Sequence, residues 1–455
     1  MKPADTQLQS GLDDARLARD LAPFLRPLAR PADEDALLEH LAAGRLVMLG
    51  EATHGTHEFY ALRARLTRRL IEDYGFCAVI AEADWPDAWR VNQYVRGRGS
   101  DGDAMQALSG FRRFPTWMWR NTVVRDFIEW LHQFNACHSQ RQCAGFYGMD
   151  LYSLYGSMQS VLSHLDRNDP EAARRAQARY ACFESYGEDS HAYGYAASFG
   201  MQPHCEDEVL AQWREMNHRA ASLSRASGPA REEAFNALQN ARLVRNAEEY
   251  YRTMFHRRVS SWNLRDHHMI ETLQALDRHL ARDSGEPPRM VVWAHNSHLG
   301  DARAMAIHDQ GEWNVGQLAR ARWGDQVRLV GFSTYRGTLT ATPAWDAPAR
   351  RWQVREGLPG SYEAVLHATG KPRFWLPLRG DTTLASLLAQ PRLQRAIGVI
   401  YLPDTERASH YAWARLPAQF DVLIHLDQTQ ALEPLEPDPR WHAGEEPPET
   451  FPSGL

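Results

Sequence analysis

Residues 46–58 decide the fold and read Leu46-Val-Met-Leu-Gly50-Glu51-Ala-Thr-His54-Gly-Thr-His57-Glu58. The apolar run that ends at Gly50 is too short for a surface helix. The apolar residues beyond it, from Phe59 to Leu70, recur at helical spacing. The segment therefore predicts a buried strand, a polar loop in which glycine allows a tight turn, and a helix.

Similar short apolar runs recur along the chain and alternate with helical patterns. This alternation is typical of an α/β fold with a mostly parallel central sheet flanked by helices. Strands are expected near Leu46–Leu49, Cys77–Ala81, Gly145–Gly148, Met290–Ala294, Val327–Gly331, Phe374–Leu376, Gly398–Tyr401 and Val422–Ile424. Amphipathic helices are expected around Val124–Phe134 and Met269–Leu280, where apolar residues repeat at helical spacing.

Strand signals vanish between residues 154 and 262, where the chain is charged and helix-prone, with a predicted loop at Tyr186–Gly200. We expect an inserted all-helical subdomain that forms a lid or one side of a cleft. The predicted division is 1–153 and 263–435 for the two parts of the α/β core, 154–262 for the insertion, and 436–455 for a proline-rich acidic tail. A tail of that composition is expected to be extended or disordered.

The composition excludes several classes of protein. The net charge is −6, and the arginines are scattered, so no basic face for nucleic acid is expected. No stretch approaches the length of an apolar membrane span, and Met1–Gly11 is polar where a signal peptide would be apolar. The sequence predicts a soluble, cytoplasmic protein with no membrane partner.

The cysteines predict neither a disulfide framework nor a zinc site. They are odd in number and form no C-x-x-C pair. Buried free thiols are the expected state. The five residues are Cys77, Cys137, Cys143, Cys182 and Cys205.

Three predicted strands are each followed by residues that can do chemistry. The carboxyl ends of parallel strands meet at one edge of a sheet, so at least two of these groups are expected to share a cleft. His57 and Glu58 are expected in the first turn of a helix, at the rim. The three groups are Glu51, His54, His57 and Glu58; Glu82, Asp84 and Trp85; and His295, Asn296 and His298.

An imidazole near a helix N-terminus stays neutral, which makes His54 available as a general base. A carboxylate such as Glu51 or Glu82 would fix the tautomer of an imidazole and stabilise its cation. A divalent ion held by His295, His298 and the same carboxylates is the alternative. The zinc-protease pattern is not completed, because Ala61 stands at its second histidine position.

Other catalytic motifs are missing: the sequence contains no G-x-S-x-G elbow and no phosphate-binding glycine loop after a strand. Water activated by histidine is the favoured mechanism. Phe114–Asn121 contains three aromatic residues and is either a core plug or an apolar ligand face. Arg265-Asp266 is either an ion pair or a means of aiming a guanidinium at an oxyanion.

Several motifs together resemble the erythromycin esterase family, in order from about Leu46 to Leu435. They are Gly50–Glu58, Glu82, Gly148–Asp150, Arg265-Asp266 with Met269, Ala294–His298, Ser409–Tyr411 and Phe420-Asp421. The resemblance implies a mostly parallel α/β core with a helical domain along one side of a deep cleft. It also implies hydrolysis of macrolide lactones by activated water, an antibiotic-resistance activity, without a serine nucleophile, metal or cofactor.

Carried over by motif, the expected catalytic residues are Glu51, His54, Glu82, His295 and His298. Residues expected to bind substrate or the oxyanion are Arg265, His57, Trp117 and Trp119. Some family members are named succinoglycan biosynthesis proteins, and Phe114–Asn121 resembles that branch. The expected function is hydrolysis of a small-molecule ester or macrolactone. A metal-dependent hydrolase and a non-catalytic binder of a bulky amphiphile are the alternatives.

Overall fold

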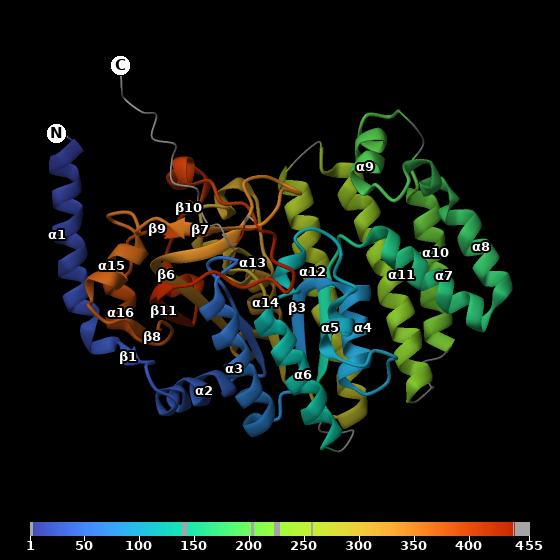
Figure 1. Cartoon of the computed structure of the whole chain (residues 1–455), viewed down its shortest axis with the longest axis horizontal. Helices are drawn as coiled ribbons and strands as arrows, with labels where there is room; N and C mark the ends of the chain where they lie inside the picture. The colour runs from blue at the N-terminus through green and yellow to red at the C-terminus, as the bar shows by residue number, and fades with distance from the viewer. Residues whose placement is uncertain are drawn as a thin grey trace.

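A central sheet organises the molecule (Figure 1), as seen in a computed structural model that describes residues 3–138, 143–201, 204–222, 228–255, 258–439 and 441. Its nine strands run in the order β1-β8-β11-β6-β2-β5-β3-β4, with β7 paired to β6. Their bounds are β1 Arg26–Pro27, β2 Leu46–Leu49, β3 Ala78–Asp84, β4 Gly145–Asp150, β5 Met290–Trp293, β6 Val327–Ala341, β7 Arg350–Val354, β8 Arg373–Pro377 and β11 Val422–Thr429. A separate pair joins β9 (Arg392–Arg395) to β10 (Tyr411–Ala414).

The sheet is mixed and mostly parallel, which confirms the predicted fold class. Strands β11, β6, β2, β5, β3 and β4 are parallel to their neighbours in this series. The antiparallel pairs are β1 with β8, β8 with β11, and β7 with β6. β5 lies between β2 and β3, with Trp293 opposite both Leu49 and Ala81. The three polar segments therefore leave the sheet side by side.

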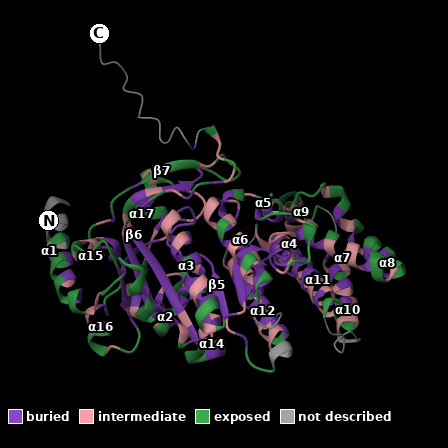
Figure 2. Cartoon of the chain, turned by 60° about the horizontal axis from the view of Figure 1, so that its bottom comes forward, coloured by how far each residue is buried: buried purple, intermediate pink, exposed green. Residues whose placement is uncertain are grey.

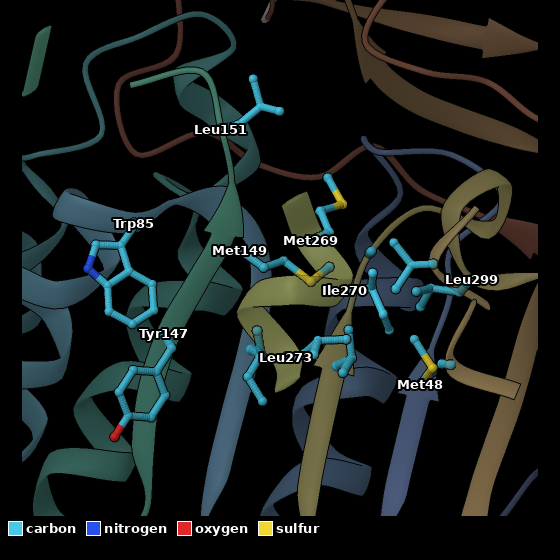
Figure 3. Packing of buried hydrophobic residues seen from close by; sticks show 14 of the residues in the cluster. Met48, Trp85, Tyr147, Met149, Leu151, Met269, Ile270, Leu273 and Leu299 are labelled. Carbon is cyan, nitrogen blue, oxygen red and sulfur yellow. The ribbon is translucent and has the colours of Figure 1, made fainter. Parts of the chain in front are cut away.

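Both faces of the sheet are covered, which explains why its central strands are apolar without alternation. Met48 packs in the core on one face and Val47 in the core on the other. Figure 3 shows Met269 and Leu273 of α12 (Arg258–Ser284) packed with Met48 on the first face. The second face is covered by α2 (Glu34–Ala42), α3 (His57–Tyr74) and α6 (Thr122–Ala136). Figure 2 shows the buried strands between helices whose outer faces are exposed.

A helical region comprises α7–α12. Helices α7–α11 occupy one end of the molecule, beside α4 (Trp85–Val95), and α12 lies against the sheet (Figure 1). The region consists of α7 Leu154–Asn168, α8 Pro170–Tyr180, α9 Ser190–Ser198, α10 Glu206–Ser222, α11 Pro229–Thr253 and α12. α12 crosses the boundary predicted at residue 262, and the division into domains stays a prediction. Most of the predicted tail, 436–455, lies outside the described residues.

The remaining helices are short, apart from α1, and connect or flank the strands. None of the helices in the described part of the chain is long and apolar enough to cross a membrane. The remaining helices are α1 Pro3–Leu21, α5 Ala104–Leu108, α13 Asn296–Leu299, α14 Val315–Trp323, α15 Tyr362–Ala368, α16 Thr382–Leu387, α17 Glu406–Ser409 and α18 Leu416–Gln419.

Two local predictions are wrong. Gly398–Tyr401 is not a strand, because Ile397 and Ile400 form only isolated bridges, to Thr53 and Thr342. The predicted loop Tyr186–Gly200 contains α9, which Asp189 caps by accepting hydrogen bonds from two backbone N–H groups. Gly194, inside this helix, allows α9 to approach the backbone of α11 at Tyr251. This glycine therefore serves helix packing rather than a turn.

The prediction for the cysteines is also wrong. Cys182 and Cys205 form a disulfide, with Cα atoms 6.0 Å apart across 23 residues of sequence. Cys137 is an exposed free thiol, and Cys77 and Cys143 are half-buried. The disulfide joins two segments of the helical region, a proximity that cysteine spacing alone does not reveal.

Candidate active site

The loop after β2 places a buried carboxylate, Glu51, between an imidazole and a guanidinium. His54 Nδ1 lies 2.9 Å from Glu51 Oε1, and Arg63 Nη2 lies 2.8 Å from Glu51 Oε2. Arg63 belongs to α3 and is fully buried, and its guanidinium stacks 4.3 Å from the centre of the Tyr60 ring. The negative charge that burial would otherwise destabilise is balanced by Arg63.

The proton positions on His54 follow from its partners. A carboxylate accepts hydrogen bonds, so we assign the proton to Nδ1, which leaves the lone pair on Nε2. No described residue hydrogen-bonds to that Nε2. His54 thus has one nitrogen fixed by Glu51 and one available to a ligand, as in the histidine of a Ser-His-Asp triad.

His295, which follows β5, has the opposite arrangement. Its Nδ1 accepts a hydrogen bond from the backbone N–H of Ser297, 3.3 Å away, as the N-cap of α13. Its Nε2 lies 3.3 Å from the carbonyl oxygen of Ala52, so we place the proton there. Burial and the neighbouring His54, whose ring centre is 4.7 Å away, hold the pKa of His295 well below its usual value. His295 is therefore a neutral imidazole with no free lone pair.

Glu82, at the end of β3, forms hydrogen bonds to the segment after β5 and to α12. Its Oε2 accepts the backbone N–H of His295 at 2.8 Å, and its Oε1 accepts from Arg265 Nη2 at 2.6 Å. Burial opposes ionisation, but His298 and Arg265 outweigh it and hold the pKa of Glu82 well below its usual value. Glu82 is an anion at neutral pH.

Arg265, on α12, forms a two-point ion pair with Asp150 at the end of β4, with Nε–Oδ1 and Nη2–Oδ2 distances of 2.9 and 2.6 Å. Of the two alternatives for Arg265-Asp266, an ion pair between these two residues is wrong. Adjacent residues of a helix point in different directions, and Asp266 instead lies 2.9 Å from His298 Nδ1.

His298 is enclosed behind the other residues of the site. Burial lowers its pKa, but Asp266 and Glu82 together raise it to about 9. Its ring stacks on Trp262 with the centres 4.6 Å apart. His298 therefore acts as a buried cation that balances two carboxylates.

A cavity of about 160 Å³ opens beside these residues. Among the described residues that line it, His54 is the only histidine. Sixteen residues form the wall: His54, Glu82, Ala83, Asp84, Asp87, Phe111, Arg113, Phe114, Pro115, Met118, Trp119, Asp150, Tyr152, Arg265, Trp345 and Val399.

The other predicted site residues separate into two groups. Trp117 and Trp119 are both buried in the core, and Trp119 also lines the cavity, so Phe114–Asn121 contributes to the core and to the cavity wall. His57 begins α3 and lines a different hollow, together with Trp441. The predictions of Glu51, His54, Glu82, His295 and His298 as neighbours agree with this geometry, and their catalytic roles stay proposals.

Sequence reasoning missed several residues of the site. Arg63 follows Phe59 at helical spacing and so lies on the face of α3 that the sequence predicted to be buried. A charged residue on a buried face indicates a buried ion pair. Asp87, Arg113 and Trp345 carried no comparable signal. In the described ranges, no three His, Cys, Asp or Glu side chains converge in a way that could hold a metal ion.

The chain is also similar to known proteins. The sequence profile described as Erythromycin esterase matches residues 71–429, well over half of the chain. The chain belongs to the erythromycin esterase family. Erythromycin esterase type II of Escherichia coli is 21% identical over 342 residues, covering 72% of this chain and 78% of that protein. A putative hydrolase of Bacillus subtilis, YbfO, is 21% identical over 388 residues, covering 79% and 80%.

Solved structures of similar proteins share the erythromycin esterase fold. A Bacillus cereus protein gives a TM-score of 0.73 at 19% identity, covering 93% of this chain and 99% of its own. A succinoglycan biosynthesis protein gives 0.71 at 19%, covering 92% and 98%. A variant of the erythromycin esterase EreC in its open conformation gives 0.63 at 16%, covering 90% and 97%. At these identities the likeness concerns the fold alone.

Proposed function

We propose that this protein hydrolyses an ester or macrolactone by direct attack of water that His54 activates. The observation that carries the proposal is the Glu51–His54 pair, in which Nδ1 is fixed and Nε2 is free beside the cavity. Family membership supports an esterase, and the names of two relatives, erythromycin esterase type II and EreC, support a macrolactone as one candidate substrate.

The chemistry needs one base and no covalent intermediate. His54 Nε2 takes a proton from water while the water oxygen attacks the ester carbonyl carbon. The tetrahedral oxyanion then collapses, and the imidazolium returns the proton to the departing alkoxide, giving one acid and one alcohol. Glu51 stabilises the imidazolium between these steps, and Arg63 holds Glu51 in place.

His295 is the weaker candidate for the base. Its Nδ1 already accepts from Ser297, and its Nε2 carries a proton. We assign it a positioning role, since its ring lies against that of His54.

Arg265 can stabilise the oxyanion only through Nη1. Its other two nitrogens donate to Glu82 and Asp150. Nη1 lies 2.9 Å from Nε2 of the cationic His298, which cannot accept a hydrogen bond, so an N–H of Nη1 remains for a ligand. We propose that this N–H binds the carbonyl oxygen of the substrate.

The cytoplasmic location stays a prediction, and a disulfide is more typical of an oxidising compartment.

The test is to incubate the purified protein with a panel of macrolides and aryl esters and to follow product masses. We expect one or more substrates to gain the mass of one water, and the gain to disappear in His54→Ala. Ligands that bind but are recovered unchanged would contradict the proposal and favour the non-catalytic binder. Loss of activity on exhaustive chelation, with a stoichiometric metal found by elemental analysis, would favour the metal-dependent alternative.

A further inference from the structure

Another cavity, of about 330 Å³, opens in the helical region and is lined by residues of α10, α11 and α12. It is distinct from the cavity beside His54. Helix α12 reaches both, because it carries Arg265 in the wall of the first and Arg278 in the wall of the second. These two arginines are separated by about 20 Å along the helix axis.

Arg242, on α11, places a guanidinium in the wall of this helical cavity without a carboxylate to balance it. Its Nη1 donates to the carbonyl oxygen of Glu271 at 3.1 Å, and its Nη2 donates to Thr272 Oγ1 at 2.9 Å and to Gln239 Oε1. All three acceptors are neutral. The Nε atom is buried and has no hydrogen-bond partner in the described part of the chain. A buried charge without a counterion is costly, so an anionic ligand would be favoured here.

The other charged groups around the helical cavity do not supply the missing counterion. The Glu271 carboxylate lines the cavity but has a guanidinium of its own, since its Oε2 lies 3.9 Å from Arg245 Nη2. His279 Nε2 lies 2.8 Å from Glu232 Oε1, so these two side chains balance each other. The uncompensated positive charge therefore falls at Arg242.

The pKa of Arg242 reflects this imbalance. Burial lowers it to about 10; Glu271 opposes the shift, whereas the guanidiniums of Arg245 and Arg278 add to it. Arg242 is still a cation at neutral pH. Arg278 is exposed, so water screens its charge, and one enclosed positive charge remains to be balanced. A ligand with a single negative charge would balance it.

Apolar side chains form another part of the wall. Trp213, Phe235 and Leu238 line the helical cavity, and the Phe235 ring is held by stacking on His279 with the centres 3.8 Å apart. Such walls suit an aromatic or alkyl group. Inorganic phosphate has no apolar part, and its second negative charge would be repelled by the Glu271 carboxylate.

We propose that this cavity binds a carboxylate that carries an aromatic or alkyl group, with its oxygens beside Arg242 and Arg278 and its apolar group against Trp213 and Phe235. The planar guanidinium fork matches the geometry of a carboxylate. The site goes beyond the proposed function, because it lies apart from His54 and does not require ester cleavage.

The test compares two probes of equal size, 3-phenylpropanoate and its neutral amide, 3-phenylpropanamide, by titration calorimetry. We expect the wild-type protein to bind the carboxylate about tenfold more tightly or better, the worth of hydrogen bonds to a charged group. Arg242→Met should abolish that preference, and Arg278→Met should reduce it. Arg174→Met, at an exposed position of α8, is the matched control and should retain it.

Binding to His54→Ala separates this inference from the hydrolase proposal, because the carboxylate should bind that variant as tightly as it binds the wild-type protein. A loss of binding there would place the probe in the other cavity and overturn the site. Equal binding of both probes to the wild-type protein, or tighter binding of inorganic phosphate, would also overturn it. So would a preference that Arg242→Met retains when circular dichroism shows it to be folded. If Arg242→Met does not fold, a full preference in Arg278→Met would overturn the site.

Discussion

At the scale of single residues, the site depends on buried charges that have fixed partners. Glu51 is charged in the interior because Arg63 lies against one oxygen and His54 against the other. Glu82 is charged because Arg265 and His298 face it. Removing one member of such a pair leaves the other charge buried and unbalanced.

Arg63→Met should therefore lower the free energy of unfolding by about 3 kcal/mol, the lower range for breaking a buried pair. It should also reduce ester hydrolysis, because Glu51 loses the partner that positions it. Urea unfolding measures the first effect. Arg69→Met breaks an exposed pair with Asp73 on the same helix and should cost less than about 1 kcal/mol. Equal losses in the two variants would contradict the role of Arg63.

His298 predicts a dependence of stability on pH. Its folded-state pKa, about 9, lies above its unfolded value of about 6.5. Its contribution is therefore fully present below about pH 6.5 and is lost as the pH rises through about 9. Relative to His298→Gln, the wild-type protein should lose about 3 kcal/mol of unfolding free energy across this range.

Chemical denaturation of both proteins at pH 6 and at alkaline pH measures this difference. His308→Gln, at an exposed position, controls for loss of an imidazole as such. A stability difference between wild type and His298→Gln that does not change with pH would mean that His298 is not held as a cation.

At the scale of elements, the sequence predicted the central strands well and the edges poorly. β2, β3 and β5 are continuous apolar runs because helices cover both faces of the sheet. β7 and β10 are partly exposed and carry no such run, so their pairing depends on tertiary contacts that the sequence does not display.

The loop after β2 is held against β6 by close backbone packing at Gly55. A Cβ at Gly55 would come within 1.7 Å of the carbonyl oxygen of Thr340, so the loop or the strand would have to move. Gly55→Ala should lower the free energy of unfolding by about 1–3 kcal/mol and displace His54, reducing activity as well. Thermal and urea unfolding test the first effect, and ester turnover the second.

Gly398→Ala is the matched control, because a Cβ there meets nothing within 4 Å. It should change stability by less than about 0.5 kcal/mol. A stable, fully active Gly55→Ala variant would mean that the position of His54 does not depend on this packing.

At the scale of the whole molecule, the sequence predicted the mostly parallel core, the helical region and the five residues that lie together at the strand ends, but not the order of the strands in the sheet. It could not predict what closes the cavity. Trp345, on the loop between β6 and β7, contacts Phe114 and also His191 of α9, so it links the core to the helical region. Such contacts join segments far apart in sequence and leave no periodic pattern.

The cavity of about 160 Å³ is smaller than the roughly 300–1,000 Å³ that drug-sized ligands occupy. A bulky lactone therefore needs Trp345 to move, and this residue is 48% exposed. Trp345→Ala should raise kcat/KM for bulky lactones several-fold relative to small aryl esters. An unchanged ratio between the two substrate classes would exclude Trp345 as the barrier.

The assignment of the base to His54 rather than to its neighbour His295 is the central claim. It is tested most directly by kcat/KM of His54→Ala and His295→Ala toward one ester, with circular dichroism to confirm that both variants are folded. We predict a loss of at least about 10²-fold for His54→Ala, as for loss of a general base, and a smaller loss for His295→Ala. Near-wild-type turnover by folded His54→Ala, or a larger loss in His295→Ala, would contradict the account.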